Sequence, residues 1–238
     1  MVRYRGLCPL STTPGVRTGI KFTKWPRVLS HITPKQQTSF HFAVSIMSQL
    51  HTAVAERLQT LLPQRVPEDH EGFSAVAVLL LPTDSGGEIF LIRRAERPTD
   101  HWSGHMALPG GRRQASDVDL LETAIRETRE ETGVELKREL VLGELDDLRS
   151  TTPSLPPVVV RPYVFGLHTR PEIIPNHEVA GHIWVNTREL VQSEKVTTVS
   201  VRGKQMQVEG FVVASHVIWG MTRRIIKPFL ELVNSTGL

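Results

Sequence analysis

The stretch "LPGGRRQASDVDLLETAIRETREETGVEL", residues 108–136, places a diglycine turn directly before a helix-like segment that is rich in glutamate. Glu127, Glu130 and Glu131 stand at positions i, i+3 and i+4, so a helix brings all three carboxylates to one side. Like charges at this spacing repel one another. A hard divalent cation among the oxygens removes the repulsion, and Mg²⁺ is usually held by a few carboxylates together with waters and substrate phosphates.

The two glycines support the same interpretation. Gly110 and Gly111 allow the backbone to approach closely and to turn a carbonyl toward a metal, while the amides at the start of the following helix can bind an anion. Arg126 can pair with Glu130 one helical turn later and hold that carboxylate in one orientation. The alternative is that "RETREE" is a solvated helix face with ordinary ion pairs. The full spacing R-E-x-x-E-E-x-G favours a metal site, because a chance match in one chain of this length is improbable.

With "PGG" before it, this spacing resembles the Nudix box, G-x5-E-x7-R-E-U-x-E-E-x-G-U, in which U is apolar. The residues that match are Gly111, Arg126, Glu127, Glu130, Glu131, Gly133 and Val134. Two departures are present: Thr128 occupies an apolar position, and the segment from Gly111 to Arg126 is one residue longer than the pattern. The early glutamate therefore has no direct match, and Asp117 is its first substitute, with Asp119 and Glu122 as the others.

The resemblance implies an α/β/α sandwich (α/β, or α+β, with a mixed β-sheet) and an Mg²⁺- or Mn²⁺-dependent hydrolase of nucleoside diphosphate derivatives. It also implies that Gly110, Glu127, Glu130 and Glu131 bind the metal. Glu127, Glu130 and Arg126 are the expected catalytic residues, with Glu127 or Glu130 as general base. Asp117 and Glu178 are additional candidates, and Glu178 could equally be a surface strand residue.

Beyond the box, the sequence resembles the coenzyme A pyrophosphatase branch of the family over most of residues 73–233, including "VIWGMT" at 217–222. The upstream signature of that branch is altered, since Trp102 and His105 replace its histidine and glutamine. Coenzyme A is thus the first expected substrate, and ADP-ribose, NADH and dinucleoside polyphosphates are alternatives. A non-catalytic nucleotide-binding module is a further alternative. The candidate substrate-binding residues, each of which could instead be packed or solvated, are Arg93, Arg94, Trp102, His105 and Arg112.

Apolar periodicity predicts the remaining elements. Helical spacing covers residues 50–62, and a second helix runs from a cap at Ser116 or Asp117 to Gly133, with Val118, Leu121, Ile125 and Thr128 on its apolar side. A last helix is expected over 216–233, with Pro228 as a break or kink. Expected strands are 73–82, 88–95, 106–108, 140–148, 156–167 and 178–185.

The net charge of +3 is an average over two unlike parts. Residues 1–46 hold seven basic residues and no acidic one, which leaves 21 basic and 25 acidic residues in 47–238. We expect the first segment to be a disordered tail, a targeting peptide or upstream codons before a start at Met47, and residues 47–238 to be the Nudix domain. The basic excess lies outside this domain and therefore does not predict nucleic-acid binding.

Composition limits the remaining possibilities. No run of about 18 apolar residues predicts a membrane span, and the lone cysteine, Cys8, excludes an internal disulfide framework. We expect a cytoplasmic protein, with organelle targeting by the first segment as the alternative. The expected partner is a small nucleoside diphosphate derivative, and the sequence leaves open whether the domain forms a homodimer.

Overall fold

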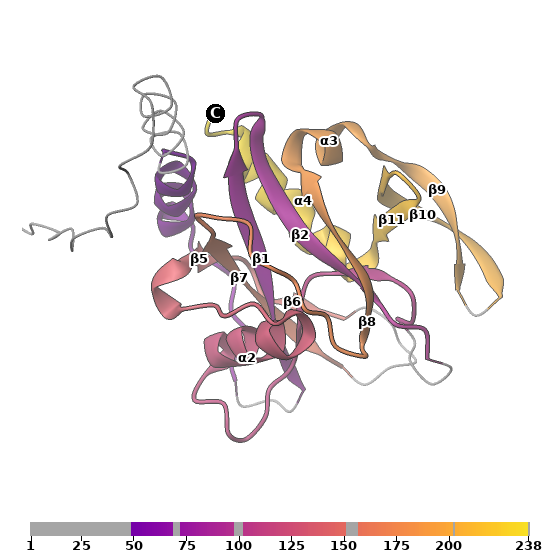
Figure 1. Cartoon of the computed structure of the whole chain (residues 1–238), viewed down its shortest axis with the longest axis horizontal. Helices are drawn as coiled ribbons and strands as arrows, with labels where there is room; N and C mark the ends of the chain where they lie inside the picture. Colours follow the sequence, from indigo (N-terminus) through magenta and orange to yellow (C-terminus); the bar gives the residue numbers. More distant parts are fainter. Residues whose placement is uncertain (1–48, 69–71, 98–101, 151–156, 202, 238) are drawn as a thin grey trace, which may run out of the picture.

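The structure is a computed structural model that describes residues 49–68, 72–97, 102–150, 157–201 and 203–237 (Figure 1). The predicted basic segment 1–46 lies outside these residues. The chain is helical over residues 49–60. The strands are β1 (Phe73–Thr83), β2 (Gly86–Arg94), β3 (Met106–Ala107), β4 (Gly110–Arg112), β5 (Val141–Glu144), β6 (Leu148–Arg149), β7 (Val159–Gly166), β8 (Val179–Asn186), β9 (Glu194–Val201), β10 (Lys204–Val213) and β11 (His216–Trp219). The helices are α2 (Leu120–Thr132), the 3-10 turn η2 (Arg138–Leu140), α3 (Thr187–Gln192) and α4 (Gly220–Asn234).

Strands β1 to β8 form one mixed sheet around β1 and β7. These two strands are parallel and pair from Phe73 with Val159 to Leu80 with Gly166, whereas the other pairings of the sheet are antiparallel. Every residue of β7 is buried, which fits a central strand covered on both faces. Strand β2 pairs with β1 at one end and with β3 at the other, and β4 pairs with β1. This insertion of β3 and β4 brings the diglycine turn into the sheet.

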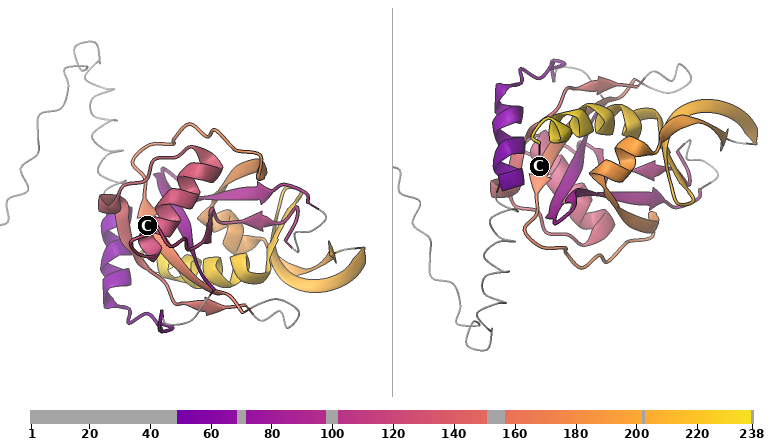
Figure 2. Two further views of the ribbon diagram at one scale, coloured as in Figure 1. Left: turned by 90° about the horizontal axis from the view of Figure 1, so that it is seen from below. Right: turned by 90° about the horizontal axis from the view of Figure 1, so that it is seen from above.

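Helices cover the sheet on both faces, as Figures 1 and 2 show. Leu120 and Ala124 of α2 pack in one buried cluster with Leu79 and Phe90. The opposite cluster holds residues of the 49–60 helix and of α4: Leu50, Val54, Leu58, Ile225, Ile226, Phe229, Leu230 and Val233. The arrangement confirms the predicted α/β/α sandwich with a mixed sheet.

Helix α2 begins later than the sequence predicted. Its N-terminal cap is Asp119, whose Oδ1 accepts from the amide of Glu122 at 2.8 Å, and not Ser116 or Asp117. Val118 therefore precedes the helix and is 82% exposed, so its predicted place on the apolar side is wrong. The predicted end is confirmed, because Gly133 has φ 72° and its amide donates to the carbonyl of Arg129.

A second sheet of three antiparallel strands, β9 to β11, follows α3 and projects from the body of the molecule (Figure 2). Residues 216–219, predicted as the start of the last helix, form β11 instead, and the helix starts at Gly220 with φ 63°. A left-handed residue at this point turns the chain from strand to helix, which the apolar spacing alone did not indicate. Pro228 lies inside α4. None of the helices in the described part of the chain is both long and apolar enough to cross a membrane.

Candidate active site

The diglycine turn lies against β1 and against the side chain of Glu127. Gly110 has φ 150°, and a Cβ there would lie 2.3 Å from the carbonyl oxygen of Ala75. A Cβ on Gly111 would lie 2.5 Å from the carboxyl carbon of Glu127. Both distances are far below van der Waals contact, but an added Cβ meets backbone at Gly110 and only the movable end of a side chain at Gly111. The backbone of the turn therefore sits directly on the glutamate side of α2.

Glu131 is the most buried carboxylate of the cluster. It is 2% exposed, and its Oε2 accepts a hydrogen bond from the amide of Gly110 at 2.9 Å. Burial raises the pKa of Glu131 to about 7, the nearby Glu127 and Glu178 add to the rise, and the Gly110 amide and Arg94 oppose it. The sequence did not indicate this burial, and the structure places Glu131 within the buried side of the helix. A buried carboxylate of this kind is stabilised by a cation.

Arg126 donates hydrogen bonds to five acceptor oxygens at the other side of the cluster. Its Nε and Nη2 donate to the two oxygens of Asp117 at 2.9 and 3.0 Å. Its Nη1 donates to Glu127 at 2.8 Å and to Glu130 at 3.1 Å, so the predicted pair one turn apart is present. The carbonyl of Arg112, at the end of β4, accepts from Nη2 at 3.0 Å. Arg126 thereby holds three carboxylates and joins α2 to the diglycine strand.

Both oxygens of the Asp117 carboxylate accept hydrogen bonds from Arg126. Asp117 is 6% exposed and also accepts from the hydroxyl of Thr123 at 2.9 Å. The hydrogen bonds from Arg126 hold the pKa of Asp117 well below its ordinary value. The other two substitutes for the early glutamate lie elsewhere, since Asp119 caps α2 and both Asp119 and Glu122 pair with Arg138. Asp117 is therefore the one of the three that contacts the arginine of the box.

Glu178, which comes just before β8, lies close enough to the cluster for its charge to act on two of the glutamates. Its charge contributes to the raised pKa values of Glu127 and Glu131, although burial is the largest cause for both. Arg97 pairs with Glu178 at 3.2 Å. The amide of Glu178 donates to the side chain of Asn176 at 2.8 Å, which fixes the backbone there. The predicted additional carboxylate thus lies with the others, and Arg97 is a neighbour that the sequence did not indicate.

Thr128 shows why a polar residue is tolerated at an apolar position of the box. It is fully buried, and its hydroxyl donates to the carbonyl of Ala124 at 2.7 Å within the helix. Thr132 does the same toward the carbonyl of Thr128 at 2.5 Å. A buried hydroxyl that is hydrogen-bonded avoids most of the cost of burial. This departure leaves the packing of α2 intact.

The structure places four of the five predicted substrate-binding residues in two groups and leaves Trp102 outside both. The charge of Arg94 acts on Glu131, and Arg112 is exposed at the end of β4 next to the cluster. Arg93 lies on the opposite face of β2, where it lines a groove together with His105. Trp102 is 40% exposed and does not line this groove. Trp219, which the sequence did not single out as a site residue, contacts the ring of His105 with centroids 4.9 Å apart.

The donor set has the chemistry that a divalent metal requires. Among the described residues, no three His, Cys, Asp or Glu side chains are arranged as a metal site as they stand. Glu127 and Glu130 nevertheless contact the same nitrogen of Arg126, and Glu131 contacts the turn that carries Gly110. Carboxylate and carbonyl oxygens are the ligands that Mg²⁺ prefers. The residues present therefore fit a hard divalent cation between α2 and the turn.

Comparison with known proteins gives an independent result. A model of the NUDIX domain matches residues 73–203. An uncharacterized protein of Schizosaccharomyces pombe is 36% identical over 126 residues, which are 51% of this chain and 38% of that protein. An uncharacterized Nudix hydrolase NudL of Photorhabdus laumondii is 33% identical over 149 residues, which are 61% of this chain and 76% of the relative. A MutT/nudix family protein of Enterococcus faecalis superimposes with a TM-score of 0.49 at 19% identity, covering 85% of this chain and 75% of that one.

Proposed function

Because the chain belongs to the Nudix family and is a Nudix pyrophosphohydrolase, we propose that it cleaves the diphosphate of a nucleoside diphosphate derivative in a reaction that needs Mg²⁺ or Mn²⁺. The observation that carries the proposal is the buried Glu131 carboxylate, hydrogen-bonded to the Gly110 amide beside Glu127. Such a buried acidic cluster has little structural use without a cation, because the desolvated charges repel one another.

We assign the metal to Glu127, Glu130, Glu131 and the carbonyl of Gly110. When bound, a divalent cation neutralises diphosphate charge and makes phosphorus more electrophilic. The chain itself supplies the orientation. Arg126, held by Asp117, keeps Glu127 and Glu130 on one side of the site. Arg94 adds a positive charge close to Glu131, where the anionic substrate would lie.

The general base is assigned to Glu127 or Glu130, with Glu178 as the third candidate. A water attacks one phosphorus, its proton passes to the carboxylate, and the bond from that phosphorus to the bridging oxygen breaks, which releases two phosphate monoesters. The Glu130 side chain is 46% exposed and that of Glu127 is 16% exposed, so Glu130 has the more open access to water. The Glu178 side chain is 40% exposed and is paired with Arg97.

Coenzyme A is the first substrate that we propose. The support is the sequence resemblance to the coenzyme A pyrophosphatase branch, including the extra residue before Arg126 and Asp117 upstream of it. The altered signature at Trp102 and His105 concerns the loop before β3 and not the carboxylates. ADP-ribose, NADH and dinucleoside polyphosphates share the diphosphate and are the alternatives.

The test is hydrolysis by the full chain with Mg²⁺ or Mn²⁺ of coenzyme A, ADP-ribose, NADH, dinucleoside polyphosphates, nucleoside triphosphates and nucleotide sugars, with products identified by mass. We expect phosphopantetheine and adenosine 3′,5′-bisphosphate from coenzyme A. Cleavage of a different compound alone would overturn coenzyme A as the substrate but support the proposed reaction. No cleavage of any compound with either metal would overturn the proposed activity and favour a binding module.

A further inference from the structure

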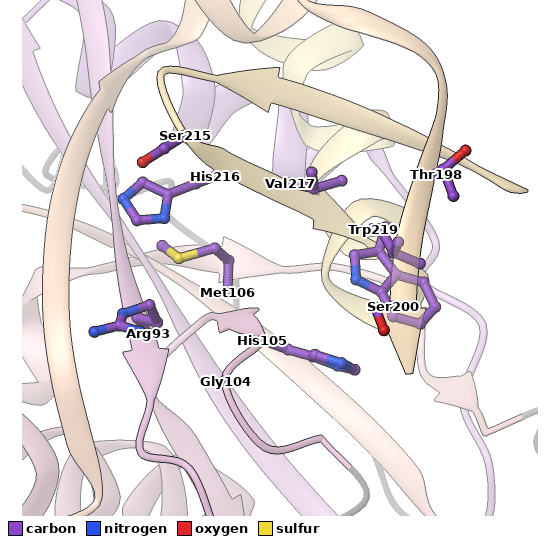
Figure 3. A pocket seen from close by; sticks show the side chains of 11 residues that line it. Arg93, Gly104, His105, Met106, Thr198, Ser200, Ser215, His216, Val217 and Trp219 are labelled. Atoms are coloured by element: carbon purple, nitrogen blue, oxygen red, sulfur yellow. The ribbon is translucent and has the colours of Figure 1, made fainter. Parts of the chain in front are cut away.

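A groove of about 610 Å³ is lined by residues of β2, β3, β9 and β11 (Figure 3). Arg93 in the groove and Arg94, whose charge acts on Glu131, are neighbours on β2 and therefore point to opposite faces of the strand. One wall consists of residues 104–106 and Arg93, and the other belongs to the projecting sheet of β9 and β11. The ring of His105 touches that of Trp219 where the two walls meet. The groove is thus built between two parts of the molecule, and the carboxylate cluster contributes no residue to it.

The wall on the projecting sheet combines three apolar side chains, Val199, Val217 and Trp219, with the polar Thr198, Ser200, Ser215 and His216. Val217 and Trp219 pair with Val212 and Gly210, and Val199 pairs with Met206, so strand register places all of these on one face of the sheet. Gly210 lets Val217 pack closely on this face, because a Cβ at this position would lie 3.1 Å from the side chain of Val217. An apolar surface of this kind, half exposed and open to a groove, suits a ligand with an uncharged stretch.

Both walls contribute polar groups. Arg93 provides a positive charge, His105 and His216 provide imidazole nitrogens, and Ser200 and Ser215 provide hydroxyls. None of the described residues that line the groove is acidic. A cationic ligand would have no carboxylate to pair with in this lining, whereas amide, hydroxyl and phosphate groups can form hydrogen bonds with it. The lining therefore selects a ligand that alternates apolar stretches with hydrogen-bonding groups and has a neutral or negative charge.

The groove is close to the carboxylate cluster along the chain. Arg93 in the groove is followed by Arg94, whose charge acts on Glu131. Met106 in the groove is four residues before Gly110, a distance of at most about 14 Å for an extended chain. A flexible arm of that length that leaves a diphosphate at the cluster can reach the groove.

We propose that this groove binds the arm of the substrate beyond the scissile diphosphate, and that the arm is long, largely uncharged and rich in amide or hydroxyl groups, as phosphopantetheine is. The inference rests on the proposed function, since it assigns the second half of the same substrate. It makes the groove the part of the enzyme that distinguishes long-armed from short-armed diphosphates.

The test compares Ser200→Tyr with Val196→Tyr in the full chain. Both residues are exposed and lie on β9 with the same orientation, but only Ser200 lines the groove. Calorimetric titration with phosphopantetheine should show a Kd at least about tenfold higher for Ser200→Tyr than for wild type, and an unchanged Kd for Val196→Tyr. Adenosine 3′,5′-bisphosphate should bind all three proteins equally. Steady-state kinetics should show a raised KM for coenzyme A with unchanged kcat, and unchanged constants for ADP-ribose.

Each other outcome has a defined meaning. Equal phosphopantetheine binding by the three proteins, or none by wild type, overturns the groove assignment. A KM that rises equally for coenzyme A and ADP-ribose also overturns it, because the groove would then bind the adenosine half that the two compounds share. If no compound is hydrolysed but Ser200→Tyr alone loses phosphopantetheine, the proposed reaction fails and the groove assignment stands.

Discussion

At the scale of single residues, Glu131 is a buried carboxylate, which costs free energy of folding, and it accepts one specific hydrogen bond, from the Gly110 amide. Glu131→Gln keeps the shape and the carbonyl acceptor but removes the charge. We expect kcat to fall by about a hundredfold or more, because a charge at the reacting centre is lost. Unfolding in a chelator should show an unchanged or higher Tm, since a buried charge has been removed. Glu135→Gln, at an exposed position after the helix, is the control and should behave as wild type in both measurements.

Asp117 has a different role, because it contacts Arg126 and not the turn. Asp117→Asn should lower stability by about 2 kcal/mol, the scale of hydrogen bonds to a charged group, measured by urea unfolding at neutral pH. It should also lower kcat with little change in KM, because Arg126 would no longer hold Glu127 and Glu130 in place. A loss of stability with unchanged kcat would show that Asp117 supports the fold alone.

Residue identity predicted which side chains come together at this site, but not their burial. The spacing of Glu127, Glu130 and Glu131 indicated one cluster, and the structure places them on one helix beside Gly110 and Gly111. It could not indicate that Glu131 is buried, because burial depends on where β1 and β4 lie relative to α2. Arg97 and Trp219 were missed for the same reason: their contacts are with residues far away in sequence.

At the scale of elements, the diglycine turn gives a prediction in which two neighbouring glycines differ. Gly111→Ala directs a methyl group at the Glu127 carboxylate, a flexible side-chain end that can move, so the protein should fold and lose most of its activity. Gly110→Ala directs it at the backbone of β1 at a φ of 150°, so it should lower Tm strongly.

The control for these substitutions is Gly203→Ala, at a position whose φ of 75° is also positive but which has no atom within 4 Å of an added Cβ. It should cost only the backbone strain of about 1 kcal/mol and leave hydrolysis unchanged. Equal loss of Tm in both turn variants, with equal residual activity, would contradict the separate roles of the two glycines. Circular dichroism melting and turnover of the best substrate measure both properties.

Elements with strong apolar periodicity were predicted well, and the prediction of the other elements failed for identifiable reasons. The buried runs of β1, β2 and β7 were located to within a few residues. The start of α2 was placed too early, because Asp117 resembles a cap but is used by Arg126. Strands β9 and β10 were not predicted at all, although "VTTVSV" at 196–201 carries a β-branched signal that could have indicated the first of them.

At the scale of the whole molecule, Asp147 joins the chain before β1 to the centre of the sheet. Its carboxylate accepts a hydrogen bond from the Val66 amide and forms an ion pair with Arg161 of β7. Burial by itself raises the pKa of Asp147, but the hydrogen bonds from Arg161 and the Val66 amide outweigh it, so the pKa is lowered overall. A lowered folded pKa stabilises the fold above the unfolded value of about 3.9, and the contribution is lost as the pH falls through the folded pKa.

Stability measured by urea unfolding should therefore decrease as the pH falls below about 4. Asp147→Asn should have a lower free energy of unfolding than wild type at neutral pH. Its free energy of unfolding should fall less on acidification, so that the two proteins become equally stable at low pH. The side chain of Asp147 is fully buried, so Asp146→Asn on the exposed neighbouring position is the control. A constant difference between wild type and Asp147→Asn at all pH values would contradict the assignment.

The central claim, that the glutamates of α2 perform metal-dependent hydrolysis, is tested most directly by one series of rates. Hydrolysis of coenzyme A, or of the best substrate in the panel, is measured against Mg²⁺ concentration for wild type, Glu127→Gln and Glu130→Gln. We predict no wild-type activity in a chelator, full recovery on adding Mg²⁺ or Mn²⁺, and a kcat lower by about a hundredfold or more in both variants at saturating metal with an unchanged Tm. Equal rates for the three proteins, or wild-type activity that persists in the chelator, would contradict the claim.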